Sequence, residues 1–306
     1  MGQVMFSARA GIQIIAVTAV IFSLLISAPK VGAAGSNWYV GASIPVMYID
    51  DTDTITTGSS AANPTTMPPT PPSTYRGKAV NKYDTGFKLE GVIGYELGSN
   101  VRVELELFYS EADVDKLIYS DVSTTIQGPQ PVTFNISEEA RPPVSGSAEQ
   151  VGAMLNLWYD IDLGSKWTPY IGVGVGVIEV DFGDVKYDDN ALAQHVANEV
   201  AVIQAQAANP GVPREALLMG VMNDPRLQLP QGYAPSVSTT DTVFAYQAAA
   251  GVSYQFKDNL VLRLGYRYQT SDDLKFKGRS NPFGNTVNTK TDFDVQFIEI
   301  GFRYHF

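Results

Sequence analysis

The chain has 306 residues, no cysteine, 17% charged residues and a formal net charge of −11 at neutral pH. The lack of cysteine excludes disulfides, iron–sulfur clusters, thiolate zinc sites and cysteine nucleophiles, and the acidic balance argues against a nucleic-acid partner. A mean hydropathy of −0.04 excludes a protein built from many membrane-spanning helices.

The first 34 residues have the order of a secretory signal peptide. Arg9 is followed by an uncharged, mostly apolar run over residues 11–28, and small residues at 31–34 offer a cleavage site. A permanent membrane anchor is the alternative, since the run is barely long enough to span a bilayer. We expect residues 1–34 to be removed and residues 35–306 to form one domain outside the cytoplasm.

From Trp38 onward, apolar side chains recur at every second position, which is the period of a β-strand. Eight segments show this alternation: 38–48, 87–97, 101–110, 150–161, 169–177, 244–254, 260–269 and 297–306. Each has the roughly 9–11 residues that a tilted transmembrane strand requires.

The gaps between these segments alternate in length. Three are tight turns at 98–100, 163–166 and 257–259, and four are long polar stretches at 50–84, 112–146, 181–242 and 272–292. This order predicts an all-β fold, an eight-stranded antiparallel transmembrane β-barrel with four long extracellular loops. The even number of strands places both termini on the periplasmic side of the bacterial outer membrane.

A soluble lipocalin-like barrel or a β-sandwich is the alternative fold. Such folds turn their apolar face inward and their charges outward. Here the apolar face is aliphatic in its middle and aromatic at its ends, as Trp38 and Tyr48 illustrate for the first segment. Aromatic ends are typical of the girdles that flank the lipid-facing band of a membrane barrel.

The opposite face of the segments carries charges that we expect to line the barrel lumen. They are Lys88, Glu90, Arg102, Glu104, Glu106, Arg263, Arg267, Glu299 and Arg303. The interior of an eight-stranded barrel is just wide enough for side chains to fill, and buried charges require partners. The pattern therefore predicts a plug of ion pairs, with a narrow gated pore as the alternative.

Other candidate motifs fail on their spacing. The glycines at 172, 174 and 176 lack the third position of a dinucleotide fingerprint, and we expect large neighbours to pack over them. Asp51 and Asp53 lack the remaining ligands of a calcium loop. His195 and His305 lie far apart and have no serine partner at an obvious strand position, so neither an enzyme nor a cofactor is expected.

The third long loop, 181–242, has a helical pattern. Asp189 or Asn190 can cap a first helix with an apolar stripe at Leu192, Val196, Val200 and Ile203, and Pro213 can open a second helix with Leu217, Leu218, Val221 and Met222. We expect a helical hairpin that folds on itself or over the barrel mouth, with a surface for an extracellular partner as the alternative. Five prolines in 63–73 predict an extended segment in the first loop.

Three stretches carry a family resemblance: Tyr246–Tyr254, Leu264–Tyr268 and the terminal Ile300–Phe306. The first two resemble the penultimate hairpin of small bacterial outer-membrane barrels. The chain is similar to the OmpA-like and Opa-like eight-stranded superfamily, and within it to the major surface proteins of rickettsia-type bacteria. The resemblance implies that Phe302, Tyr304 and Phe306 form the signal that the barrel-assembly machinery reads.

These patterns predict a non-catalytic surface protein that acts through its extracellular loops as an antigen, structural protein or adhesin. The expected partners are outer-membrane lipid, lipopolysaccharide, the barrel-assembly machinery and a host-cell or other extracellular ligand. A small diffusion porin is the alternative function.

Overall fold

The computed structural model describes residues 37–60, 72–127, 131–136, 144–187, 198, 201–202, 205–206, 208–225, 236–280 and 285–306. These residues contain the helix α3 (Arg214–Met222) and fourteen β-strands in one antiparallel network. The strands are β1 (Trp38–Ser43), β2 (Val46–Ile49), β3 (Thr52–Ser60), β4 (Ser73–Tyr83), β5 (Gly86–Gly98), β6 (Val101–Ile126), β7 (Val132–Ile136), β8 (Val144–Asp160), β9 (Trp167–Tyr187), β10 (Ser236–Lys257), β11 (Leu260–Ser271), β12 (Leu274–Ser280), β13 (Asn285–Thr291) and β14 (Val295–His305).

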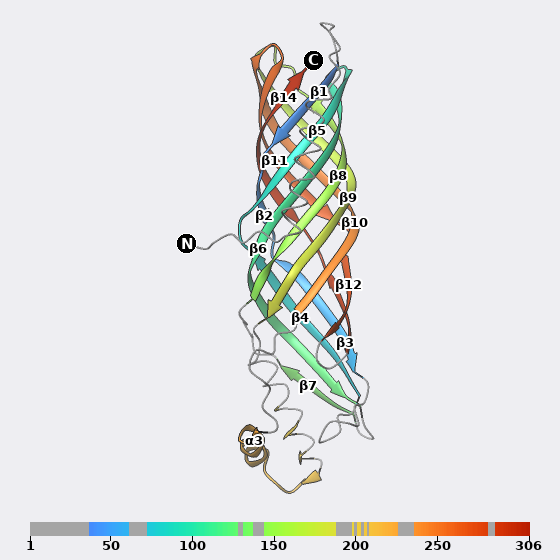
Figure 1. Ribbon diagram of the computed structural model, residues 1–306, viewed down its shortest axis with the longest axis vertical. Helices are drawn as coiled ribbons and strands as arrows, with labels where there is room; N and C mark the ends of the chain where they lie inside the picture. Colours follow the sequence, from blue (N-terminus) through green and yellow to red (C-terminus); the bar gives the residue numbers. More distant parts are fainter. Residues whose placement is uncertain are drawn as a thin grey trace.

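The strand pairings close into a ring. Its order is β1, β5, β6, β8, β9, β10, β11, β14 and back to β1. Val40 marks the closure, because it pairs with Tyr304 on one side and with Ile93 on the other. All eight segments expected from the alternation lie in this ring, which forms the upper part of the molecule in Figure 1.

The first segment is interrupted once. β1 ends at Ser43 and β2 begins at Val46, because Pro45 has no N–H to donate to a neighbouring strand. Its carbonyl still accepts a hydrogen bond from the Lys88 amide at 3.0 Å, and the Ile44 amide donates to the Ile300 carbonyl at 3.2 Å. The ring therefore stays connected across the break.

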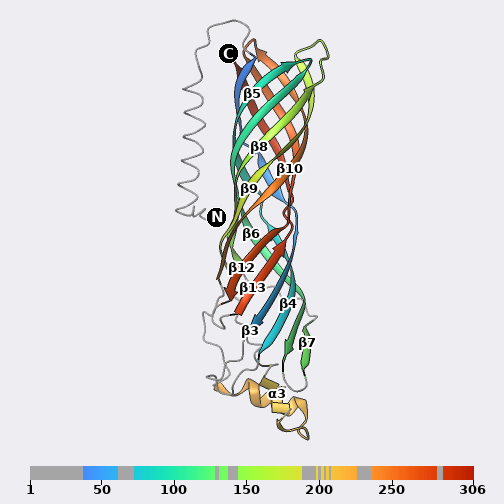
Figure 2. The same cartoon turned by 90° about the vertical axis from the view of Figure 1, so that its right-hand side faces the viewer.

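The expectation of eight strands and four long loops is confirmed only in part, because the described residues contain fourteen strands. Strands continue well beyond the ring at the end opposite the short turns: β3, β4, β7, β12 and β13 lie wholly within the expected loops, and β6, β8, β9 and β10 extend into them. The order β12-β13-β3-β4-β6-β7 forms a sheet that continues the ring wall (Figure 2).

Threonine explains why these expected loops form strands. β-branched threonine favours extended backbone, and facing threonines join the strands: Thr54 Oγ1 lies 3.1 Å from Thr291 Oγ1, and Thr56 Oγ1 lies 3.2 Å from Thr289 Oγ1. Such polar cross-strand pairs stabilise a sheet without an apolar stripe. The sequence pattern in this region is therefore polar although the structure is regular.

The short turns are as expected. Between β5 and β6 the chain reverses at Gly98, Ser99 and Asn100, which have φ values of 85°, 53° and 65°. Such left-handed backbone is accessible mainly to glycine and asparagine. The turn brings β5 and β6 into register along almost the whole of β5.

The second helix expected in the third loop is present as α3, directly after Pro213. Residues 201–202 and 205–206 are also helical, in the region of the expected first helix. The proposed cap at 189–190 and the apolar stripe of that first helix lie outside the described residues, as do residues 1–36 and most of 63–73.

The outer face of the ring is apolar. Ile300 and Val173 expose 68% and 60% of their surface. Exposed aromatic side chains lie near both ends of this band: Trp38, Tyr159, Trp167 and Tyr304 near the short turns, and Tyr48, Tyr246 and Tyr268 near the extended sheet. We call the second group, nearer the extended sheet, the outer girdle.

Candidate functional site

The ring interior holds the nine charged side chains expected in the lumen. Lys88 and Glu90 come from β5, Arg102, Glu104 and Glu106 from β6, Arg263 and Arg267 from β11, and Glu299 and Arg303 from β14. None of them exposes more than 5% of its surface. Since β1 separates the β5–β6 pair from the β11–β14 pair, ion pairs between the two groups cross the lumen.

Arg267 is the centre of this lumen network. Its Nη1 lies 2.6 Å from Glu106 Oε2 and 3.3 Å from Glu90 Oε2, and its Nη2 lies 2.9 Å from Glu299 Oε2. Lys88 Nζ lies 2.6 Å from the other Glu106 oxygen. The Arg267 contacts with Glu106 and Glu299 are charge-assisted hydrogen bonds. Together with the ion pair to Glu90 they link β11 to three other ring strands.

A second group of ion pairs lies nearer the short turns. Arg102 donates from Nε and Nη2 to both Asp160 oxygens, at 2.6 and 2.9 Å, and from Nη1 to Glu104 Oε1 at 2.8 Å. Arg263 Nη2 lies 2.5 Å from Glu90 Oε1. Asp160 was not among the residues expected in the network, although it lies on the inward face of its segment.

Neutral polar side chains complete the network, although the predicted set contained charged residues alone. Tyr39 donates its hydroxyl to Glu104 Oε1 at 2.7 Å, and Asn156 Nδ2 donates to Glu106 Oε2 at 2.7 Å. Gln247 Nε2 donates to Asn156 Oδ1 at 2.6 Å. All three occupy inward positions of their strands. The alternation of the sequence therefore contained the information needed to place them in the lumen.

Arg303 differs from the other four lumen cations. Among the described residues no carboxylate lies within ion-pair distance of it, and its Nη2 donates to the Ser253 hydroxyl at 3.3 Å. Its Nε and Nη1 have no hydrogen-bond partner there, and its guanidinium lies 5.5 Å from the centre of the Tyr39 ring. Arg303 is thus buried with incomplete compensation.

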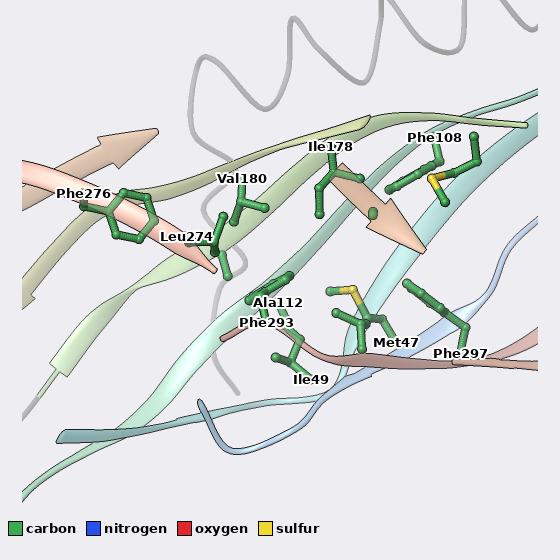
Figure 3. Packing of buried hydrophobic residues seen from close by; sticks show 14 residues of the cluster. Met47, Ile49, Phe108, Ala112, Ile178, Val180, Leu274, Phe276, Phe293 and Phe297 are labelled. Atoms are coloured by element: carbon green, nitrogen blue, oxygen red, sulfur yellow. The ribbon is translucent and has the colours of Figure 1, made fainter. Parts of the chain in front are cut away.

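Between the ion pairs and the extended sheet the interior becomes apolar, and Figure 3 shows the packing of these buried side chains. The cluster consists of Met47, Ile49, Phe108, Ala112, Ala148, Met154, Ile178, Val180, Ala245, Leu274, Phe276, Phe293, Val295 and Phe297. Lys88 joins the two zones, with its Nζ 4.1 Å from the centre of the Phe108 ring and 4.6 Å from that of Phe297. The alternation placed Phe108 and Met154 on this inward face, and both are buried there. It did not predict that the apolar residues gather into a zone separate from the charges.

The inward glycines of β9 do not leave an open wall. A Cβ built at Gly172, Gly174 or Gly176 meets, respectively, Trp158 Cε3 at 2.1 Å, Asn156 Oδ1 at 2.0 Å and Met154 Sδ at 2.5 Å. Each glycine therefore makes room for a larger side chain of the adjacent strand β8. The lumen is filled at the place where a gap was most plausible.

The expected assembly signal lies on the outer face of β14. Phe302 and Tyr304 expose 37% and 40% of their surface, and the rings of Tyr304 and Phe306 lie 5.7 Å apart. β14 pairs with β1 and β11, so this aromatic group lies at the closing seam of the ring.

The acidic residues Asp51 and Asp53 form ion pairs with lysines of the same chain. Lys82 pairs with Asp51, and Lys78 Nζ lies 3.0 Å from Asp53. In the described part of the chain, no group of three or more His, Asp or Glu side chains is arranged to hold a metal ion. His305 Nδ1 lies 3.6 Å from Glu96, and His195 is outside the described residues.

No helix among the described residues is both long and apolar enough to cross a membrane.

A curated relative named outer membrane protein, from Gluconacetobacter diazotrophicus, is 29% identical over 102 residues, or 32% of this chain. The match spans only 22% of that relative.

Three solved structures illustrate the similarity to known folds. OprG from Pseudomonas aeruginosa is 14% identical, with 89% of this chain and 97% of that one covered and a TM-score of 0.46. Neisserial surface protein A is 15% identical, with 89% and 98% covered and a TM-score of 0.36. The protease OmpT from Escherichia coli is 8% identical, with 88% and 97% covered and a TM-score of 0.39.

The family model for the outer membrane protein beta-barrel domain matches residues 17–306. That match covers the whole closed ring and its extended sheet. The chain therefore belongs to the outer membrane β-barrel family and is a protein of the bacterial outer membrane.

Proposed function

We propose that this protein is a non-catalytic surface protein in which a plugged eight-stranded transmembrane ring carries an extracellular display structure. The short turns and both ends of the mature chain face the periplasm, and the extended sheet and α3 face outward. The closer likeness to the surface antigens of rickettsia-type bacteria remains part of this proposal, as does removal of residues 1–34.

The filled lumen is the observation that supports this function best. Five cations, those of Lys88, Arg102, Arg263, Arg267 and Arg303, lie among the five carboxylates of Glu90, Glu104, Glu106, Glu299 and Asp160. The apolar cluster then closes the half nearer the extended sheet. Ions need a continuous polar path, and an apolar layer over a paired polar layer does not provide one.

A small porin is the second candidate, and one observation favours it. Arg263 Nε and Arg303 Nε are buried without hydrogen-bond partners in the half nearer the short turns, so water can enter that half to satisfy them. Conduction would also require the apolar cluster around Phe108 and Phe297 to move aside.

Planar-bilayer recording of the purified full-length protein tests the choice. We expect insertion without steady conductance, with a general porin in the same bilayers as the positive control for the recording. Insertion is verified separately by resistance of the ring to added protease. Stable, ohmic single-channel currents from the wild type would overturn the closed-lumen function and establish the porin.

A further inference from the structure

The outer face of the extended sheet carries a concentration of positive charge. Two rows of residues cross four strands in register. One row is Lys275, Lys290, Ile55 and Lys78, and the next is Lys277, Asn288, Thr57 and Arg76. We call the five cations Arg76, Lys78, Lys275, Lys277 and Lys290 the basic face. Adjacent strands lie about 4.8 Å apart, so the basic face spans roughly 15 Å.

The basic face points away from the interior. The alternate residues of the same strands are buried on the other side, where Leu274 and Phe276 expose 0% and 5% of their surface and Ala79 exposes 5%. Lys275, Lys277 and Arg76 are exposed. The five side chains therefore remain accessible to a partner beside the sheet.

Acidic neighbours neutralise only part of this charge. Lys78 Nζ lies 3.0 Å from Asp53, and Lys290 Nζ lies 2.8 Å from Asp273. Arg76, Lys275 and Lys277 form no ion pair with a described residue. Lys275 also lies directly opposite Lys290, and like charges in that position destabilise a sheet. A net positive surface of this kind, in a chain of net charge −11, is suited to an anionic partner.

The height of the basic face above the membrane identifies that partner. Gln296 pairs with Tyr48 and Tyr268 of the outer girdle, and Lys290 lies six residues before Gln296 on the chain. At about 3.3 Å per residue and a tilt near 40°, Lys290 lies about 15 Å beyond the girdle. The sheet continues the ring wall at this height (Figure 2), so the face looks sideways along the membrane rather than outward from its tip.

We propose that the basic face binds the phosphorylated core sugars of neighbouring lipopolysaccharide molecules. Lipopolysaccharide surrounds an outer-membrane barrel on the extracellular side, and its core phosphates lie above the lipid headgroups. This inference rests on the orientation given in the proposed function. A host polyanion would approach the tip of the molecule, whereas the exposed cations lie on its flank.

Binding of purified lipopolysaccharide to the full-length protein in phospholipid nanodiscs tests this proposal. The test variant is K275Q/K277Q, and the matched control is K166Q/K257Q, which removes the same charge from exposed turns at the other end of the ring. We expect the test variant to bind lipopolysaccharide with a phosphorylated core about thirtyfold more weakly than the wild type, because two lysines near an anionic surface contribute roughly 1 kcal/mol each. The control variant is expected to bind like the wild type.

Three results would overturn the proposal. Equal losses of affinity in the two variants would show that binding depends only on general charge attraction. If the wild type bound dephosphorylated core, or lipid A alone, with the same affinity, the core phosphates would be excluded as the ligand. Lysine-dependent binding of a sulfated glycan without any effect on lipopolysaccharide would assign the face to a host polyanion. Currents through the ring would refute the closed lumen without affecting this measurement, so the two failures remain distinct.

Discussion

Arg267 and Arg303 occupy inward positions on neighbouring strands, yet their surroundings differ. Arg267 reaches three carboxylates within 3.3 Å, whereas Arg303 reaches only a hydroxyl among the described residues. Removing one partner of a buried ion pair leaves the other charge uncompensated. The energetic role of a buried arginine therefore depends on its partners rather than on its burial.

We expect Arg267→Met to lower the free energy of unfolding by about 3–5 kcal/mol, because Glu106 and Glu299 would lose their cation. The matched change Arg303→Met should alter it by about 1 kcal/mol or less, since only a hydroxyl and an aromatic contact are lost. Urea unfolding of the folded protein in detergent micelles measures both. Equal losses in the two variants would contradict this assignment.

At this scale the alternation of the sequence predicted which charges point inward, because strand parity fixes the face of each side chain. It did not predict which charges pair. Asp160 joins Arg102 across a strand boundary, and that contact depends on the register of β6 and β8, which a single segment does not encode. Phe108 and Met154 share the parity of the charges and were placed inward by the same alternation, but their grouping into one apolar zone depends on contacts between several strands.

At the scale of elements, β14 is the strand on which closure depends. It pairs with β11 on one side and with β1 and β2 on the other. Phe306, the residue directly after β14, donates its amide to the Trp38 carbonyl at 3.4 Å, and its ring lies 5.7 Å from that of Tyr304. The aromatic end of β14 therefore contributes both to the seam and to the outer surface.

Deletion of Phe306 should sharply reduce insertion into the outer membrane, because the terminal aromatic element would be incomplete. The matched variant Phe306→Tyr keeps an aromatic ring at the end of the chain and should insert normally. Heat-modifiable migration on gels and the yield in outer-membrane fractions measure the effect. Normal migration and yield after the deletion would show that Phe306 is not part of the assembly signal.

The elements outside the ring show why sequence patterns failed there. In the ring, lipid on one side and a filled lumen on the other impose a strict alternation. β3 and β13 are instead joined by threonine hydroxyls, so both faces are polar and no period-two hydropathy develops. α3 was predictable because Pro213 and the apolar residues at Leu217 and Val221 follow helical rules.

For the whole molecule, the proposed orientation has a direct test in intact cells. Added protease should cut within 181–242, between the ends of β9 and β10, or within 63–73, and should leave the turns at 98–100, 163–166 and 257–259 intact. Mass spectrometry of the fragments locates the cuts, and permeabilised cells provide the comparison. Cleavage at 98–100 in intact cells would show that the orientation is opposite to the proposed one.

The pairing of Val40 with Tyr304 also has a consequence for how the protein folds. The first and last strands of the ring come together only after the entire chain has been made, so the ring cannot close during synthesis. Contacts this distant in sequence slow folding, and until they form, β1 and β14 each present an open edge on which other chains can aggregate. We infer that the chain depends on being kept unfolded in transit, and that the slow step of its biogenesis is this final encounter of its two ends.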